Sequence, residues 1–330
     1  MTTSQQPVPA PGDGALPLDL IHGERREIAT LAAELAVGAP ALVDDPRWVA
    51  RARGLSCRLP ERAREALRRY RHDPGPDGIL ILRNLPVDET VLPPTPNEPD
   101  SVERAATVPA AVAVLVTLQL GEIAAYRDEK SGALVQNVVP VPGREESQSN
   151  AGSIPLELHI ENAFHPRRPD YVGLLCLRSD HSGTGGTLVS SIRRTLPLLS
   201  AETVEVLSGE RFTTSPPPSF HGSGATAPHA VLVGDPADPD VKVDFHATHP
   251  HDEAAKFALE RLRTAFLEAA TVLTLRPGEM AFVDNRIAIH GRTAYAPRYD
   301  GRDRWLHRTF VHVDHRRTRP YRPGDGSVLL

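Results

Sequence analysis

The spacing of apolar and polar residues predicts a helical region followed by a long region of strands. In residues 24–37 and 60–71, apolar side chains recur every three or four positions between charged ones, which predicts amphipathic helices. Residues 108–126 are largely apolar, and we expect them to form one long helix packed on a sheet. Two later helices are predicted at 196–207, capped by Thr195, and at 253–270.

Much of the remaining chain consists of short alternating or apolar runs bounded by glycine, proline and polar residues, which is the pattern of strands. The predicted strands are 78–83, 134–139, 156–160, 171–178, 187–191, 229–234, 241–246, 279–283, 287–291 and 305–312. Many short strands separated by turn signals favour a sandwich or a barrel over a doubly wound sheet. No glycine-rich phosphate-binding motif follows any of these strands, so nucleotide binding is not favoured.

These elements predict one domain over residues 18–330, with a helical extension at its N-terminal end. Residues 1–17 are polar and rich in proline, which predicts a disordered tail. Residues 213–225 are rich in proline, glycine and serine, and they predict a flexible lid over a binding site.

One predicted strand carries two potential metal ligands on the same face. Apolar and polar side chains alternate over residues 156–161, so His159 and Glu161 point the same way. An imidazole and a carboxylate on one side of a strand can share a metal ion. A third ligand would complete the two-histidine, one-carboxylate set of non-haem Fe(II) sites. The pair alone is a weak signal, because the same pattern describes a strand with one polar rim.

A later stretch supplies the missing parts of such a site. His290 ends an apolar strand and precedes Gly291, which permits close approach of the main chain. Arg304 stands directly before the predicted strand 305–312 and continues its alternation. Arg308 therefore projects from the same face as Arg304. A buried guanidinium is costly unless it meets an anion, and arginine holds carboxylates through paired hydrogen bonds. Dicarboxylates and amino acids supply such anions.

Taken together, the motifs resemble those of the Fe(II)/2-oxoglutarate-dependent oxygenases of the clavaminate synthase-like group, and most closely its free amino-acid hydroxylases. The resemblance spans about residues 75–315. It implies a mainly β fold with flanking helices around a double-stranded β-helix, or jelly roll. It also implies that His159, Glu161 and His290 hold Fe(II), with O2 and 2-oxoglutarate as cosubstrates. Arg304 and Thr187, which follows a Gly-Gly turn, would bind the 2-oxoglutarate carboxylate.

The same resemblance implies a free L-amino acid as the substrate. Arg308 with Ser149 would hold its α-carboxylate, and Gln136 with Glu161 its α-ammonium group. Asn150 follows the pattern of the asparagine-type enzymes.

The side chain of the substrate would be recognised by the predicted strand 241–246. Asp244 matches the acid that binds an amide or guanidinium donor in the family, and His246 shares its strand face. Lys242 stands where the arginine hydroxylases have a second acid. A lysine beside the aspartate favours a ureido or carboxamide group, as in citrulline, glutamine or asparagine. If Lys242 points away from the site, arginine returns as a candidate.

The resemblance therefore predicts hydroxylation of an unactivated C–H bond of a free polar L-amino acid, in antibiotic biosynthesis. A carboxylate at position 161 favours hydroxylation over halogenation, since related halogenases lack it. A desaturase or cyclase of the same family, a non-redox Zn-dependent jelly-roll enzyme and a binding module without catalysis are the alternatives.

Composition excludes several other classes. The net charge of −5 gives no overall basic field, and the arginine-rich segment 298–322 is interleaved with aspartates, so nucleic acid is not an expected partner. Two cysteines without a Cys-x-x-Cys motif exclude a disulfide framework and a thiolate zinc site. Without a signal peptide or a long apolar run, no membrane association is expected, and the predicted location is the cytoplasm.

Overall fold

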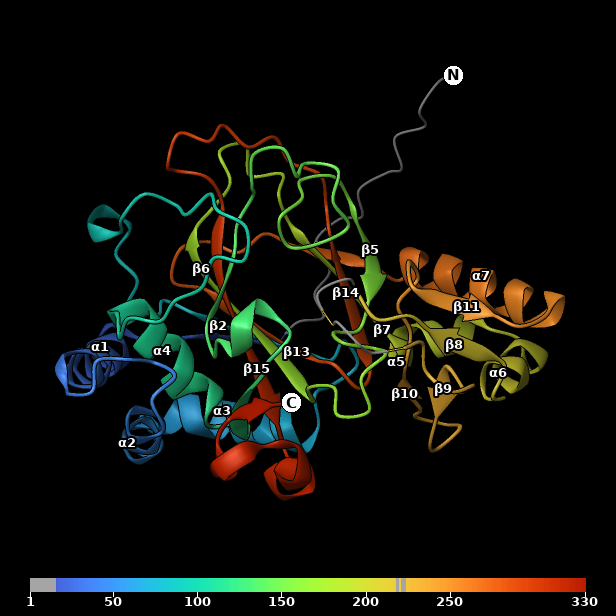
Figure 1. The fold of residues 1–330 in the computed structure, drawn as a ribbon, viewed down its shortest axis with the longest axis horizontal. Helices are drawn as coiled ribbons and strands as arrows, with labels where there is room; N and C mark the ends of the chain where they lie inside the picture. Colours follow the sequence, from blue (N-terminus) through green and yellow to red (C-terminus); the bar gives the residue numbers. More distant parts are fainter. Residues whose placement is uncertain (1–15, 218–219, 221–223) are drawn as a thin grey trace.

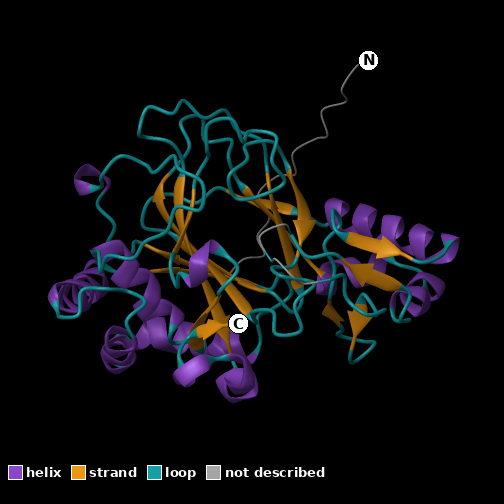
Figure 2. Ribbon diagram, viewed as in Figure 1, coloured by secondary structure: helices purple, strands orange, loops and turns teal. Residues whose placement is uncertain are grey.

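The computed structural model describes residues 16–217, 220 and 224–330, in which two β-sheets face each other with helices outside them (Figures 1 and 2). The larger sheet has the order β1-β2-β13-β6-β15-β3-β16, and β4 also pairs with β15. Its strands are β1 (Leu16–Asp19), β2 (Ile79–Arg83), β3 (Glu122–Tyr126), β4 (Gln136–Val138), β6 (Tyr171–Arg178), β13 (Met280–Asp284), β15 (Trp305–His312) and β16 (Val328–Leu329).

The smaller sheet has the order β12-β7-β14-β5. Its strands are β12 (Thr271–Leu273), β7 (Thr187–Ser191), β14 (Ala288–Arg292) and β5 (Leu156–His159). Two strand pairs lie outside both sheets: β8 (Phe212–Thr214) with β11 (Thr248–Pro250), and β9 (Leu232–Val233) with β10 (Asp240–Val241).

Helices cover the outer side of each sheet (Figure 1). The larger sheet is covered by α1 (His22–Val37), α2 (Pro46–Ser56), α3 (Glu61–His72) and α4 (Val108–Thr117). The smaller sheet is flanked by α5 (Ile192–Thr195), α6 (Ala201–Leu207) and α7 (Glu253–Glu268). Short 3-10 turns are η1 (Glu89–Val91), η2 (Lys130–Gly132), η3 (Leu196–Leu198), η4 (His315–Tyr321) and η5 (Pro323–Asp325).

The alternation along β2 explains how the layers are held together. Leu80 and Leu82 pack into the core beneath the helices, whereas Ile79 and Ile81 face the space between the sheets. Both faces of this strand are therefore buried, and the run is apolar throughout rather than alternating. Residues of β7 and β14 join the same inter-sheet core, so the two sheets form a sandwich.

The prediction of one helix over residues 108–126 is wrong. The helix α4 ends at Thr117, and Glu122–Tyr126 forms β3, which pairs antiparallel with β15. Gly121 approaches β15 so closely that an added Cβ would lie 2.5 Å from the carbonyl oxygen of His312. A largely apolar run fits a buried helix and a buried strand equally well, so its pattern could not locate this turn.

Other boundaries also differ from the predictions. Residues 196–207 are divided between η3 and α6, and α6 is capped by Ser200 rather than Thr195. The pattern missed α2, although Asp45 caps it through the Arg47 amide. Leu16 and Pro17, placed in the disordered tail, belong to β1, while residues 1–15 lie outside the described residues.

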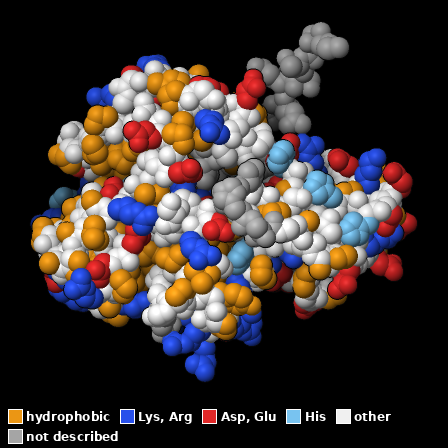
Figure 3. Space-filling model, viewed as in Figure 1, with side chains coloured by type: hydrophobic (Ala, Val, Ile, Leu, Met, Phe, Trp, Pro, Cys, Tyr) orange, Lys and Arg blue, Asp and Glu red, His pale blue; other side chains and the backbone are white. Residues whose placement is uncertain are grey.

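The predicted strands 229–234 and 241–246 are reduced to the short pair β9 and β10. The predicted lid at 213–225 lies only partly within the described residues, since 218–219 and 221–223 fall outside them. Within the described ranges, no helix is both long and apolar enough to cross a bilayer. On the face drawn in Figure 3, acidic and basic side chains are interspersed, and basic ones gather at its lower end.

Candidate active site

The three predicted metal ligands meet at the edge of the smaller sheet. His159 ends β5, and His290 in β14 is its direct antiparallel partner, with the ring centroids 4.6 Å apart. Glu161 follows two residues after His159, and its Oε2 lies 3.5 Å from Nε2 of His290. One ligand atom from each residue lies within 4.8 Å of the other two, a spacing that one metal ion can bridge.

The hydrogen bonds around this triad leave ligand atoms available for a metal ion. The Nδ1 of His159 lies 2.8 Å from the carbonyl oxygen of Glu157, which places the proton on Nδ1 and leaves Nε2 free to coordinate. Among the described residues, the buried Oε2 of Glu161 has no hydrogen-bond partner. Two imidazoles and one carboxylate form a donor set that suits Fe(II). The residues therefore fit a non-haem iron site.

A buried amide holds Glu161 in place. The Oδ1 of Asn285 accepts from the main-chain N–H of Glu161 at 2.7 Å, and its Nδ2 donates to the Glu161 carbonyl at 3.0 Å. Asn285 lies directly after β13 and is fully buried. Sequence reasoning did not single it out, because an asparagine after a strand is an ordinary turn signal.

Electrostatics favour the metal-binding protonation states of two triad residues, Glu161 and His290. Burial opposes ionisation of Glu161, but the Arg308 guanidinium and the His290 imidazole outweigh it and hold the pKa of this carboxyl well below its usual range. Burial, reinforced by His159, lowers the pKa of His290. Glu161 is therefore favoured as the carboxylate and His290 as the neutral imidazole, and these are the forms that coordinate metals.

The predicted cosubstrate residues also lie together. Arg304 immediately precedes β15, and its Nε donates to the carbonyl of Gly185 at 3.1 Å. Its Nη2 lies 3.4 Å from Oγ1 of Thr187, the first residue of β7. Both side chains are buried, and their donors can converge on one carboxylate.

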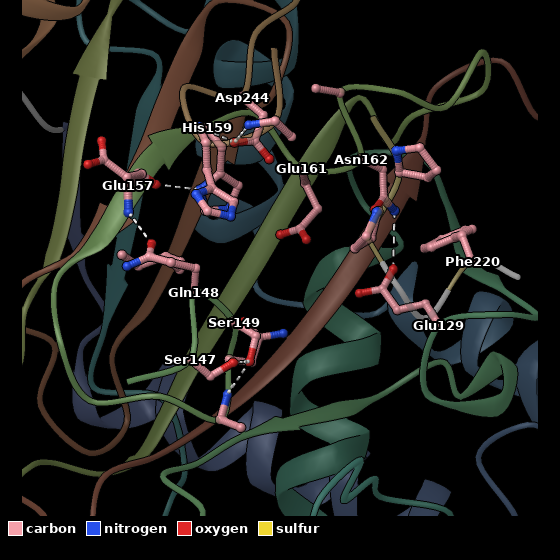
Figure 4. A pocket seen from close by; sticks show the side chains of 18 of the residues that line it. Glu129, Ser147, Gln148, Ser149, Glu157, His159, Glu161, Asn162, Phe220 and Asp244 are labelled. Atoms are coloured by element: carbon pink, nitrogen blue, oxygen red, sulfur yellow. Dashed lines mark hydrogen bonds between the residues drawn. The ribbon is translucent and has the colours of Figure 1, made fainter. Parts of the chain in front are cut away.

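A cavity of about 710 Å³ is lined by two residues of the triad, His159 and Glu161. Figure 4 shows His159 and Glu161 projecting into it, with Asp244 beside His159 and with Glu129 and Asn162 on the other side of Glu161. Its lining includes the predicted substrate residues Ser149, Asn150, Glu161, Asp244, His246 and Arg308. Most of these residues come from the loops that follow strands, and the sandwich beneath them fixes where those loops begin.

Arg308 is the centre of a buried polar network in this cavity. Its Nη1 donates to Oε1 of Glu161 at 2.7 Å, and its Nε donates to Oε1 of Gln136 at 3.0 Å. Its Nη2 forms a short ion pair with Glu129. With the amide of Asn150 turned so that its oxygen faces the guanidinium, that oxygen accepts from both terminal nitrogens at 3.0 and 3.1 Å.

Two predicted substrate residues lie away from the cavity lining. Gln136 is buried behind Arg308, where its oxygen orients the guanidinium. Lys242 is also outside the lining of the cavity. Burial lowers the pKa of its ammonium group, and the nearby Arg168 guanidinium lowers it further. The reason that favoured a carboxamide or ureido side chain over a guanidinium therefore does not hold.

Sequence reasoning missed Glu129, which lies in the turn after β3. It is 9% exposed, lines the cavity and accepts from Nδ2 of Asn162 at 3.1 Å. Burial raises its pKa, as does the neighbouring Glu161, whereas Arg308 opposes the rise. The charged run Arg127-Asp128-Glu129-Lys130 looks like an exposed turn in the sequence, so no local signal identifies it.

A second group of potential ligands has a structural explanation. The Nε2 of His181 lies 3.3 Å from Asp300 and 3.5 Å from Asp303. The Asp303 carboxylate already accepts from the main-chain N–H groups of Arg298 and Tyr299. This group therefore orders the turn before Arg304.

The chain is similar to known proteins over most of its length. The family described as taurine catabolism dioxygenase TauD, TfdA family matches residues 47–310. The L-asparagine oxygenase of Streptomyces coelicolor is 52% identical, over 92% of this chain and 90% of that protein. Clavaminate synthase 2 of Streptomyces clavuligerus is 36% identical, over 88% and 90%.

Solved structures agree with these relatives. An asparagine oxygenase in complex with Fe(II), 2S,3S-3-hydroxyasparagine and succinate has a TM-score of 0.93 and 50% identity, covering 95% of this chain and 98% of that chain. The non-heme iron oxygenase OrfP in complex with Fe, succinate and (3S)-hydroxy-L-Arg has a TM-score of 0.86 and 28% identity, covering 95% and 99%.

Proposed function

The chain belongs to the TauD/TfdA dioxygenase family, and from this premise we propose that it hydroxylates free L-asparagine at C3 with Fe(II), 2-oxoglutarate and O2. The observation that carries the proposal is the triad of His159, Glu161 and His290. Its first two residues line a cavity together with Arg308 and Asp244. When bound, Fe(II) and 2-oxoglutarate would activate O2, the oxidant: 2-oxoglutarate would take up one oxygen atom and lose CO2 to give succinate, and the other oxygen atom would enter a C–H bond of the amino acid.

The protein's own residues bind and orient the two substrates. Arg304 and Thr187 hold the distal carboxylate of 2-oxoglutarate, since both donors lie beside the triad strands and away from the amino-acid cavity. Arg308 receives the α-carboxylate of the amino acid, and Glu129 receives its α-ammonium group. A zwitterion is thereby matched by a buried guanidinium and a buried carboxylate.

Asparagine is favoured by the groups that remain for its side chain. The Oδ1 of Asp244 accepts from the main-chain N–H groups of His246 and Ala247, which leaves its other oxygen for the carboxamide NH2. Asn150 offers an amide next to Arg308. The 52% identity with an L-asparagine oxygenase supports the same choice.

The fold proposed to support this chemistry is a jelly roll in a single domain. Two facing sheets share one inter-sheet core, and the helices pack on their outer sides, which agrees with a double-stranded β-helix. The TM-score of 0.93 with asparagine oxygenase supports that architecture.

The test is a panel of free L-amino acids incubated with Fe(II), ascorbate and 2-oxoglutarate. We expect L-asparagine to release succinate in step with a product that has gained one oxygen atom. Loss of two hydrogen atoms instead would indicate desaturation or cyclisation. The variant His159→Ala should release no succinate above background, because one of three metal ligands is gone.

The control is His249→Ala, which removes another histidine of the cavity lining outside the triad. It should keep succinate release within about twofold of the unsubstituted protein, as is usual for a surface substitution. Succinate release that His159→Ala leaves unchanged, or turnover with Zn²⁺ in the absence of 2-oxoglutarate, would contradict the proposal.

A further inference from the structure

Arg292 is a buried guanidinium with no part in the proposed reaction. It lies in β14 two residues after His290 and is 5% exposed. Its Nη1 donates to the carbonyl of Ser149 at 2.9 Å, and its Nη2 donates to the carbonyl of Ile154 at 3.0 Å. One side chain therefore joins both ends of the segment 149–154, which begins with Ser149 and Asn150 of the cavity lining.

The segment is packed tightly on this guanidinium. A Cβ added to Gly152 would lie 3.0 Å from Nη2 of Arg292 and 2.1 Å from the carbonyl oxygen of Ser147. The main-chain N–H of Tyr295 donates to the Ser153 carbonyl at 3.0 Å, which ties the segment to the turn after β14. We call residues 147–154 the amino-acid loop, because its Asn150 meets Arg308 and its Ser149 lines the cavity.

The charge of Arg292 has no carboxylate partner in the described ranges 16–217, 220 and 224–330, and the same holds for Arg304. The two guanidinium groups lie beside one ring, with their Cζ atoms 6.0 and 5.9 Å from the ring centroid of Tyr295. Two like charges in a buried site repel each other, and an anion between or beside them relieves that repulsion.

We propose that Arg292 is a positioning residue that couples the cosubstrate end of the site to the amino-acid loop. An anionic cosubstrate at Arg304 compensates the charge of Arg292, strengthens its hold on the loop carbonyls and raises the affinity for the amino acid. The identity of that anion as 2-oxoglutarate rests on the proposed function, whereas the hold on the loop does not.

The test compares amide hydrogen exchange in the loop, with Fe(II) under anaerobic conditions, before and after addition of 2-oxoglutarate. In the unsubstituted protein, 2-oxoglutarate should slow exchange of the amides of Gly152, Ser153 and Ile154. In Arg292→Met these amides should exchange about tenfold faster or more, the loss expected from charge-assisted hydrogen bonds, with no further slowing by 2-oxoglutarate.

Steady-state kinetics should separate an effect on amino-acid binding from an effect on turnover. Arg292→Met should raise the KM for asparagine about tenfold or more, while kcat changes by less than about threefold. Because coupling between two ligands is reciprocal, saturating asparagine should no longer tighten binding of 2-oxoglutarate in this variant. Arg292→Lys keeps the charge, so it should restore part of the slowing by 2-oxoglutarate. It also serves as the test if Arg292→Met does not fold.

The matched control is Arg322→Met, since Arg322 is equally buried and also donates to carbonyls, of Gly326 and His315, near the C-terminus. It should leave exchange in the amino-acid loop unchanged. The proposal is overturned if Arg292→Met leaves loop exchange unaltered, if 2-oxoglutarate protects that variant fully, or if Arg322→Met loosens the loop equally. A panel without succinate release would defeat the proposed function but not the ligand-free exchange difference.

Discussion

Replacing Glu129 with glutamine is expected to weaken binding of the amino acid, because only the contact with the α-ammonium group of the amino acid is lost. Glu129 forms an ion pair with Arg308, and its side chain is 12% exposed, so the carboxylate works in a desolvated cavity. A hydrogen bond to a charged group contributes about 1.5–3 kcal/mol, and each ~1.4 kcal/mol corresponds to a tenfold change in affinity. Glu129→Gln should therefore raise the KM for asparagine by about 10- to 150-fold.

The complication is that the same substitution also changes the surroundings of Arg308, the proposed partner of the α-carboxylate. An analogue that lacks only the ammonium group separates the two effects. Succinamate keeps the carboxylate and the carboxamide of asparagine, so its inhibition constant reports the Arg308 side of the site. Comparing both ligands in both proteins forms a cycle that isolates the contact between Glu129 and the ammonium group.

We expect the inhibition constant of succinamate to change by less than about threefold in Glu129→Gln, because succinamate has no ammonium group for Glu129 to bind. Glu98→Gln is the matched control, since Glu98 lines the same cavity but is exposed. It should change either constant by less than about twofold. Equal weakening of asparagine and succinamate by Glu129→Gln would refute the assignment of the ammonium group to Glu129.

Three further predictions concern the side-chain pocket, the cosubstrate and stability. Asp244→Asn should raise the KM for asparagine about tenfold or more and, by removing a repelling charge, allow aspartate to support succinate release. Arg304→Met should raise the KM for 2-oxoglutarate about 10- to 100-fold and leave the Kd for asparagine, measured by calorimetry in the absence of 2-oxoglutarate, within about threefold. His307 is fully buried without a hydrogen-bond partner among the described residues, and burial lowers its pKa from 6.5 to about 3. The unfolded chain therefore binds the proton first as pH falls, and unfolding free energy should drop by about 2 kcal/mol between pH 7.5 and 5 from this residue. Denaturant titrations of His307→Leu should show that much less pH dependence, and an unchanged pH dependence would contradict the assignment.

Local patterns were sufficient for the strands that form the metal site. The alternation over residues 156–161 predicts that His159 and Glu161 share a face, because side chains two apart on a strand do. In the structure β5 ends at His159, and Glu161 lies in the turn just beyond it. The structure adds the partner strand: β14 sets His290 directly opposite His159. Antiparallel pairing at that register could not be read from the sequence, since nothing local records which strand lies next to which.

The larger errors came from runs whose composition fits more than one environment. The largely apolar composition of residues 108–126 suits a buried helix and a buried strand equally. The turn that separates α4 from β3 depends instead on the close approach of Gly121 to β15. Lys242 and Asp244 are two residues apart and were expected to share the pocket, but only Asp244 lines the cavity. The strand predicted at 241–246 is reduced to the short β10, which ends at Val241. Alternation along residues 242–246 therefore does not show which side chains face the cavity.

The sequence by itself determined the chemistry of this protein: two histidines, one carboxylate and a pair of arginines in a strand-rich chain. Only the tertiary structure decided which polar groups complete the site, as Glu129 and Arg292 illustrate. Each meets partners that lie more than a hundred residues away along the chain: Arg308 for Glu129, and Ser149 for Arg292. Periodicity reports only the neighbours along one element. Burial of a charged side chain depends on what the folded chain brings to face it.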